Sequence, residues 1–506
     1  MQNRNTLEIF TSHANQQAVF RMNGQCAYPE SFGNPQQIPS SGLPEYKERV
    51  YMKNLLQDKI NQYKNKVDLL EIRFDERDRL LLKYMNRDFD TPAIGSSSGG
   101  CVRAFQDGAW GFTSFNDLNE IDTMIEEAIA QARVISSESF KLPPAEPIVA
   151  DVLLDLKTNP FHIPIDRKIE LLSSYNDIVM SYGGHIQNSF SFYGDTHIKK
   201  YFANSEGTLL YQEAADMVFL IYATAVKDGQ AQSRIVTNAS SKDFEFFYGF
   251  EDSIRQRCAE AEELLFAPKV KAGIYPVIAD PSLGGVFAHE AFGHTVEADN
   301  IMLKPDMMET LKIGKVFGSE QLSIYDTGLE YGSRGSYVYD DEGTPAQKTY
   351  LIKNGVLTGH LHSRETAARM NATPTGNARA LDYNFPPICR MRTTCIEAGQ
   401  HTLEDMLADI DEGVLAIDTY GGTGGEMFSF TAGMGRMIRK GKIEEVVRDV
   451  KLNGNLFRTM KDIDMIGNSL VIDESAGGCG KGGQFPLPVA EGSPYIRIQN
   501  VTMGGE

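Results

Sequence analysis

The chain has 506 residues, of which 42% are hydrophobic and 23% charged, an ordinary composition for a soluble globular protein. Its 68 acidic and 49 basic residues give a net charge of −19. This charge argues against direct nucleic-acid binding, because such binding relies on Lys and Arg to neutralise phosphates. No apolar stretch approaches the ~20 residues of a membrane-spanning helix, and the first residues lack the apolar core of a signal peptide. We expect a cytoplasmic protein without a membrane segment.

Changes in composition and stretches rich in Pro and Gly predict four segments in the chain. They are an irregular extension at 1–45, an N-terminal α/β subdomain at 46–142, a middle α+β subdomain at 148–268 and a β-rich C-terminal domain at 272–506. Apolar spacing predicts helices near 46–66, 119–135, 166–182, 252–266 and 402–410. Alternation predicts strands at 67–74 and a meander at 197–236. The expected fold class is α+β, a helix and strand region followed by a large antiparallel-β-rich C-terminal domain.

A strand predicted at 274–279 leads into a helix with clear start signals, Asp280 as N-cap and Pro281 as first helical residue. This helix carries His289 and His294, with Glu290 directly after the first histidine. In zinc peptidases, two histidines on one helix bind the metal and a neighbouring glutamate acts as general base.

The spacing of the two histidines differs from the usual four residues. His289 and His294 are five apart, so a regular helix at ~100° per residue would splay them by ~140°. One i→i+5 turn would bring the two imidazoles together, and Gly293 lowers the energetic cost of such a backbone irregularity. A regular helix with diverging imidazoles would contradict a shared metal. Two unrelated histidines that flank a glutamate are the alternative.

A catalytic zinc normally has three protein ligands and one open position. All six cysteines are expected to be reduced thiols. The best third candidate is Cys479, which glycines surround at 476–483. A metal, or Lys481, would lower the pKa of this thiol. A phosphate-binding loop fails on spacing, because Ser475 and Gly482 occupy positions that require other residue types. A merely flexible glycine loop stays an alternative.

Together with further motifs, these residues resemble the TldD/PmbA (TldD/TldE) family, specifically its TldD-type members, from about residue 67 to the C-terminus. The motifs lie at 204–207, 289–294, 340–344, 351–355, 375–377, 428–430 and 479–484. The resemblance implies a zinc-dependent peptidase that hydrolyses unfolded peptides or leader peptides. It implies Zn²⁺ ligands His289, His294 and Cys479, and Glu290 as general base. It also implies a dimer, either a homodimer or a heterodimer with a TldE-like chain.

Two other functions stay open. One is a cysteine-dependent hydrolase with Cys479 as nucleophile and His289 or His294 as base. The other is a non-enzymatic regulator, because this family has carried the name of DNA gyrase modulator. Metal removal distinguishes the cysteine hydrolase from a zinc peptidase, because only the zinc peptidase would lose its activity and regain it with zinc.

The chain also departs from the family pattern. Residues 1–45 extend beyond the family core, and residues 389–394 read Cys-Arg-Met-Arg-Thr-Thr where a Pro-Arg-Met-Thr-Asn-Thr-like run is expected. His360 and His362 stand where Tyr and Asp are usual. Being two apart, they are expected on one face of a strand as surface histidines, with contact to a metal or to the substrate as the alternative.

Acidic residues near the motifs have simpler expected roles. One of Glu297 and Asp299 is expected to orient an imidazole, because histidines that bind metals usually donate their other N–H to such a group. The run Asp340, Asp341 and Glu342 is expected to be an exposed turn rather than a cation site.

Overall fold

The structure is a computed structural model that describes residues 43–135, 140–474 and 476–504. The chain divides into two units, residues 1–49 and 50–506, and the larger unit contains every candidate site residue. Nearly all of the extension expected at 1–45, including Cys26, lies outside the described residues.

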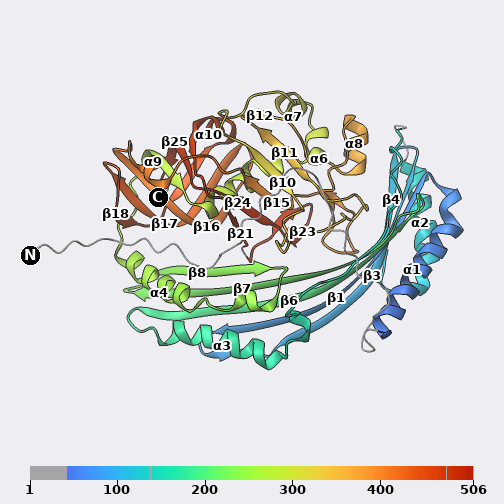
Figure 1. Cartoon of the computed structure of the whole chain (residues 1–506), viewed down its shortest axis with the longest axis horizontal. Coiled ribbons are helices and arrows are strands. Elements are labelled where there is room, and N and C mark those ends of the chain that lie inside the picture. Colours follow the sequence, from blue (N-terminus) through green and yellow to red (C-terminus); the bar gives the residue numbers. More distant parts are fainter. Residues whose placement is uncertain (1–42, 136–139, 475, 505–506) are drawn as a thin grey trace, which may run out of the picture. The chain divides into compact units, whose positions relative to one another are not determined.

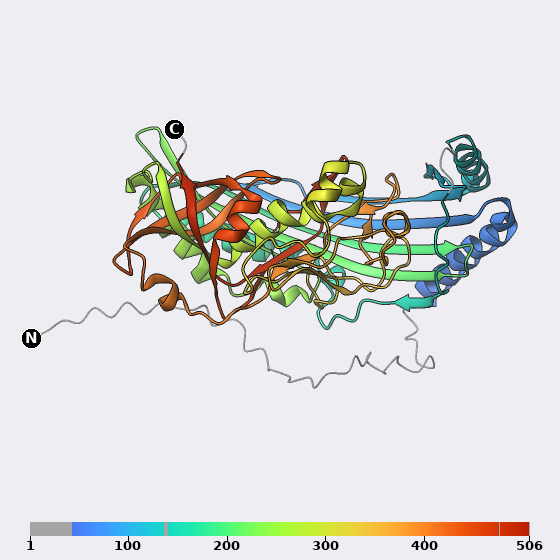
Figure 2. The same cartoon turned by 90° about the horizontal axis from the view of Figure 1, so that it is seen from above.

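One long sheet dominates the first half of the larger unit (Figures 1 and 2). All of its strand pairs are antiparallel except the pair of the last strand, β5, with β7. In spatial order its strands are β4 (Ala109–Phe115), β3 (Ala93–Gln106), β1 (Leu69–Met85), β6 (Ile186–Asn204), β7 (Leu209–Lys227) and β5 (Val149–Val152), with β2 (Asp88–Phe89) beside β1 and β8 (Gln230–Ser240) beside β7.

Strand β1 is much longer than the segment predicted at 67–74, and several of its charged residues are buried. Leu70 and Ile72 face an apolar core on one side. Glu71, Arg73 and Asp75 point to the opposite side and are only 2%, 3% and 0% exposed. Both faces of this part of β1 are therefore buried, and its charged residues do not mark a face exposed to solvent.

Four helices pack on this sheet, and their positions agree with the predictions to within a few residues. They are α1 (Leu43–Tyr63), α2 (Ile121–Ile135), α3 (Ile165–Ser181) and α4 (Glu251–Phe266). Their buried residues recur every three to four positions, as in Met52, Leu56 and Ile60 or in Ile121, Ile125 and Ile129. Figure 1 shows α1 and α2 covering one end of the sheet and α4 lying towards the other.

The C-terminal domain contains two larger sheets. The first has the order β12 (Val356–Leu357), β11 (Lys348–Lys353), β10 (Ile324–Thr327), β15 (Thr393–Ile396), β24 (Ala490–Ser493) and β21 (Val471–Asp473). The second has the order β16 (Glu412–Thr423), β9 (Gly273–Ala279), β25 (Ile496–Met503), β19 (Lys451–Asn455), β17 (Met427–Arg439) and β18 (Lys442–Val447), with β20 (Ile463–Ile466) beside β25. Strand β16 also pairs with β17, so the second sheet closes on itself. Two hairpin-like pairs complete the domain, β13 (Ala378–Arg379) with β14 (Ile388–Cys389) and β22 (Cys479–Lys481) with β23 (Gln484–Leu487).

Short helices connect these strands, and most of them were not predicted. They are α5 (Pro281–Val286), α6 (Ala298–Met302), α7 (Pro305–Thr310), α8 (Arg364–Met370), α9 (Leu403–Leu407) and α10 (Leu456–Asp462). Helices of five to seven residues are too short to show a 3.6-residue period, and they begin at caps such as Ser363 and Asn455. Only α9, capped by Thr402, and α5 had been expected.

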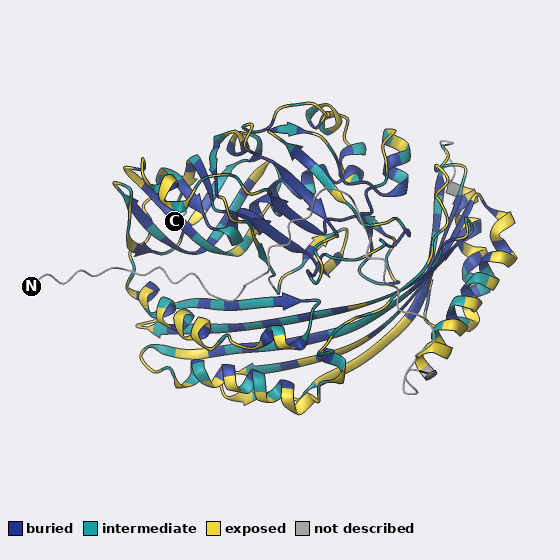
Figure 3. Ribbon diagram, in the orientation of Figure 1, coloured by how far each residue is buried: buried dark blue, intermediate teal, exposed yellow. Residues whose placement is uncertain are grey.

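The expected fold class is confirmed: helices and a long sheet precede a β-rich C-terminal domain, whose strands hold much of the buried core (Figure 3). The subdomain boundaries stay a prediction. Among the described residues, we find no helix with the length and apolar character needed to cross a bilayer.

The acidic run at 340–342 was expected to be exposed, and this is wrong. Asp340, Asp341 and Glu342 are 4%, 8% and 3% exposed, because the C-terminal domain covers the long sheet at this point. Arg103 of β3 contacts Glu342 at 2.9 Å, and Lys200 of β6 contacts Asp341 at 2.6 Å. The run therefore joins the two halves of the larger unit by ion pairs.

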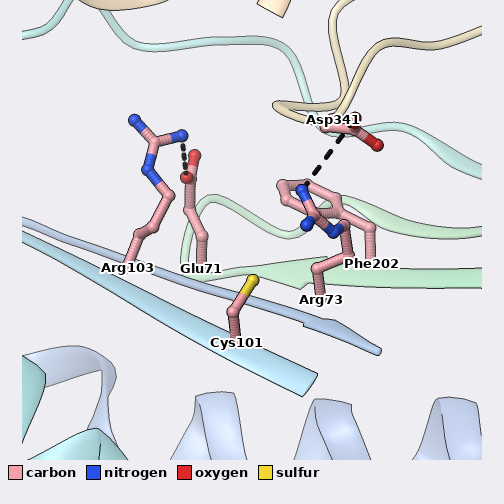
Figure 4. A pocket seen from close by; sticks show the side chains of 6 residues that line it. All are labelled: Glu71, Arg73, Cys101, Arg103, Phe202 and Asp341. Atoms are coloured by element: carbon pink, nitrogen blue, oxygen red, sulfur yellow. Dashed lines mark hydrogen bonds and ion pairs between the residues drawn. The ribbon is translucent and has the colours of Figure 1, made fainter. Parts of the chain in front are cut away.

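Charged side chains from both halves line a small pocket at this junction (Figure 4). Arg103 lies 3.0 Å from Glu71, and Arg73 lies 3.9 Å from Asp341. Burial raises the pKa of Glu71 to about 7, although Arg103 opposes the shift. Burial acts in the same direction on Asp341, but Lys200 and Arg73 outweigh it and lower the pKa of Asp341.

Candidate metal centre

Helix α5 begins as the sequence predicts. Asp280 accepts a hydrogen bond from the backbone N–H of Leu283 at 3.0 Å, and Pro281 is the first helical residue. Strand β9, which precedes the helix, pairs with β16 on one side and β25 on the other, and these pairings fix where the helix starts.

After α5 the backbone widens into a π-helical turn over Phe287–Phe292 and then tightens into a 3₁₀ turn over Gly293–Val296. The irregularity predicted from the five-residue spacing is therefore confirmed. As a result the imidazoles of His289 and His294 converge, with ring centroids 5.2 Å apart.

A glycine-rich turn supports the π-helical turn from outside. A Cβ on Gly424 would lie 1.9 Å from the backbone oxygen of Glu290, so only glycine allows this contact. The sequence suggested a turn at 421–425, but not what it packs against.

Cys479 reaches the same place from the other end of the domain. It opens strand β22, and its Sγ lies 3.4 Å from Nε2 of His294. One ligand atom each from His289, His294 and Cys479 lies within 4.8 Å of the others. The three residues singled out from spacing and loop composition are thus brought together.

The donor atoms fit a metal ion. Both ring nitrogens of His289, a residue only 1% exposed, lack a hydrogen-bond partner among the described residues. A buried polar group without a partner costs ~1–3 kcal/mol, and a bound cation would remove this cost for the nitrogen that binds it. Two imidazoles and one thiolate are a ligand set that zinc prefers.

The surroundings shift the pKa values of the two histidines in opposite directions. Burial, followed by the nearby charges of His294 and Arg390, holds the pKa of His289 well below its usual value, so its ring is neutral and can donate a lone pair. Burial also lowers the pKa of His294, but hydrogen bonds to Cys479 and Glu297 outweigh it and raise the pKa to about 10. These partners thus favour a proton on the His294 ring, which a bound metal ion would replace at Nε2.

Of the two acids expected to orient an imidazole, Glu297 makes the contact. Its Oε2 lies 2.9 Å from Nδ1 of His294, and the residue is fully buried. Asp299 instead accepts a hydrogen bond from Lys481 Nζ at 2.6 Å. Lys481 also lies 3.1 Å from Glu297, so its charge is paired with these carboxylates.

Glu290 is half-buried beside the histidines, and burial raises its pKa although His294 opposes the shift. Two neighbours were not predicted. Arg390, fully buried, donates a hydrogen bond from Nη2 to the backbone oxygen of Cys479 at 2.7 Å. Glu491 Oε1 lies 3.4 Å from Nδ1 of His289. Glu491 is an isolated acid at the edge of a glycine-rich segment, and no pattern in the sequence predicts that it lies beside His289.

The expectation of surface histidines on a strand is wrong for His360 and His362. They are 7% and 4% exposed and flank Leu361, which makes an isolated bridge to Glu297. Both line a pocket of about 730 Å³ and are not part of the ligand cluster. Nε2 of His360 donates a hydrogen bond to the backbone oxygen of Leu311 at 2.8 Å.

Three family models match the chain in order: domain 1 of the PmbA/TldA metallopeptidases at residues 70–132, their central domain at 158–264 and their C-terminal domain at 272–505. A protein named metalloprotease from Synechocystis sp. is 39% identical over 457 residues, which cover 90% of this chain and 98% of that protein. This chain belongs to the TldD/PmbA family. The names of the family and of its members indicate a metalloprotease and therefore a hydrolase.

Further relatives agree with this membership. A zinc metalloprotease TldD homolog from Saccharolobus solfataricus is 26% identical over 422 residues, 81% of this chain and 91% of that protein. The crystal structure of TldE from Thermococcus kodakarensis has a TM-score of 0.72 and 17% identity, and the match covers 89% of this chain and 100% of that chain. At this identity the structural match shows a shared fold.

Proposed function

We propose that this TldD/PmbA-family chain is a zinc-dependent peptidase in which His289, His294 and Cys479 hold the metal and Glu290 is the general base. The observation that carries the proposal is the convergence of two imidazoles and one thiol within 4.8 Å, from segments 185 residues apart. The unsatisfied ring nitrogens of His289 support it independently. The names of the relatives point the same way.

When bound, zinc supplies Lewis-acid chemistry, which polarises a peptide carbonyl and makes a water more acidic. Glu290 takes a proton from the water that attacks the carbonyl carbon, and returns it to the leaving amine nitrogen as the C–N bond breaks. Burial raises the pKa of Glu290, which makes its carboxylate a stronger base. Glu297 holds the His294 ring through Nδ1, and Arg390 holds the backbone of Cys479.

The proposed substrates are unfolded peptides or leader peptides, and the proposed location is the cytoplasm. The proposed assembly is a dimer, with a second copy or with a TldE-like chain as partner. The fold shared with a TldE structure supports the second kind of partner.

Metal content tests the ligand set. We expect about one zinc per chain in the unmodified protein purified without chelator, and a marked loss in Cys479→Ala, because two imidazoles alone bind zinc weakly. Cys258→Ala is the matched control, since Cys258 is equally buried but lies on α4. No zinc in the folded unmodified protein after incubation with zinc would reject the proposal.

Glu290→Gln tests the base. We expect this variant to retain zinc and to lose about 10²–10⁴-fold in the rate of hydrolysis of an unfolded, fluorescently labelled polypeptide. Chelation should abolish the activity of the unmodified protein, and zinc should restore it. Activity that survives complete metal removal would favour the cysteine hydrolase, with Cys479 as nucleophile.

A further inference from the structure

The ring nitrogens of the two histidines have similar surroundings. Nε2 of His294 faces Cys479, and its Nδ1 lies 2.9 Å from the carboxylate of Glu297. Nδ1 of His289 likewise faces a carboxylate, that of Glu491, at 3.4 Å. Each imidazole thus has an acid at Nδ1, and the two acids come from unrelated parts of the chain.

Close packing fixes the position of Glu491. The residue lies on β24, between β15 and β21, and its side chain is 11% exposed. Helix α5 packs directly on this strand, where a Cβ on Gly285 would lie 2.9 Å from Cβ of Glu491. The helix that leads to His289 and the strand that carries Glu491 therefore cannot move apart without losing this contact.

Among the described residues, the carboxylate of Glu491 has an ion-pair contact with His289, and the acids Asp473, Glu290 and Glu474 lie near it. In the described part of the chain no group donates a hydrogen bond to its carboxylate, and no Lys or Arg nitrogen lies within 4 Å. Nδ1 of His289 is also without a hydrogen bond there. A buried carboxylate and a buried ring nitrogen are each costly alone, and a movement of a few tenths of an ångström would pair them.

We propose that Glu491 is a positioning residue that accepts the Nδ1–H of His289, and thereby leaves Nε2 of this ring free to bind the metal, as Glu297 does for His294. The inference rests on the proposed metal site. Such an acceptor selects the tautomer and the ring orientation, and its loss typically lowers metal affinity by about 10–100-fold.

The test is zinc affinity, measured by competition of the metal-free full-length protein with a chromophoric chelator. We expect Glu491→Gln to bind zinc about 10–100-fold more weakly than the unmodified protein. Glu491→Asp, which keeps the charge but withdraws the acceptor by one methylene, should give an intermediate loss. Glu474→Gln is the control, because Glu474 lies near Glu491 but contacts the backbone N–H of Arg334 rather than a histidine.

A second readout separates positioning from direct ligation. The visible absorption bands of the Co²⁺-loaded protein should keep their positions in Glu491→Gln, since the three ligands are unchanged. Unchanged affinity in Glu491→Gln, an equal loss in Glu474→Gln, or shifted Co²⁺ bands would each overturn the inference. Absence of metal binding by the unmodified protein would instead reject the proposed function.

Discussion

The pKa of His362 is set by the residues that bury its ring, and no sequence motif predicts this burial. Its ring is buried, and burial, with a smaller contribution from His360, lowers its pKa to about 4. The pKa of His360 is lowered as well, also because of burial. Lys312 and Lys348 line the same pocket, and none of the described residues in its lining is acidic, so this lining does not favour a charged imidazole.

This residue should make stability depend on pH. Unfolded, His362 titrates near 6.5, so between pH 6.5 and 4 the unfolded chain binds more protons than the folded one. Stability is therefore lost as the pH falls, by about 2–3 kcal/mol from this residue between pH 7 and 4.5. Urea unfolding at both pH values should show a smaller loss in His362→Gln than in the unmodified protein. Equal losses in the two proteins would contradict the assignment.

Helix α5 is short, but its cap joins it to two strands. Asp280 accepts a hydrogen bond from Leu283 N–H at 3.0 Å and another from Asp418 N–H of β16 at 2.9 Å. Burial, followed by the charge of Asp418, raises the pKa of Asp280 to about 7. The carboxyl group is therefore partly protonated near neutral pH.

Substitutions of Asp280 test how much this cap contributes to the stability of the protein. Asp280→Ala removes both acceptors and should lower the free energy of unfolding by about 1–2 kcal/mol. Asp280→Asn keeps an acceptor oxygen and resembles the protonated acid, so its loss should be clearly smaller. Thermal and urea unfolding at pH 7 measure both variants. Similar losses for Asn and Ala would show that the cap is not what matters at this position.

The π-helical turn after α5 shows how far spacing can be used. A five-residue separation together with a requirement for convergence implies one extra residue in the turn, and Phe287–Phe292 has it. The contacts that stabilise the turn were not predictable in the same way. The backbone of Glu290 meets Gly424, a partner more than a hundred residues away in the chain.

Buried ion pairs hold the two halves of the larger unit together. Arg103 contacts Glu71 and Glu342 at 3.0 and 2.9 Å, and its guanidinium lies 3.8 Å from the centre of the Trp110 ring. Arg364 adds a contact to Glu206 at 2.7 Å. Removal of one partner from such a group leaves an uncompensated buried charge.

Arg103→Met should therefore destabilise the protein by about 3–5 kcal/mol. Arg439→Met is the matched control, since Arg439 pairs with Glu412 at 2.8 Å on the surface and its loss should change stability little. Urea unfolding of both variants measures the difference. Comparable effects of the two substitutions would mean that the ion pairs at the junction contribute no more than surface pairs.

Local rules accounted for much of what could be predicted. Periodicity located the long helices and the strand meander, capping chemistry located the start of α5, and spacing located the π-helical turn. Spacing and glycine composition also selected His289, His294 and Cys479, which the fold brings together. Their binding of zinc stays a proposal. These features depend on residues close in sequence, or on residue types that few structural roles require.

Only the tertiary structure decided which polar groups are buried and what they face. The acidic run at 340–342 and the pair His360 and His362 were expected at the surface, but other segments cover them. Glu491 carries no motif, and it faces His289 only because β24 lies against the helix that leads to this histidine. Burial and long-range partners depend on which elements pack together. Which elements pack together is determined by the free energy of the whole chain, and it leaves no periodic pattern in the sequence of any one segment.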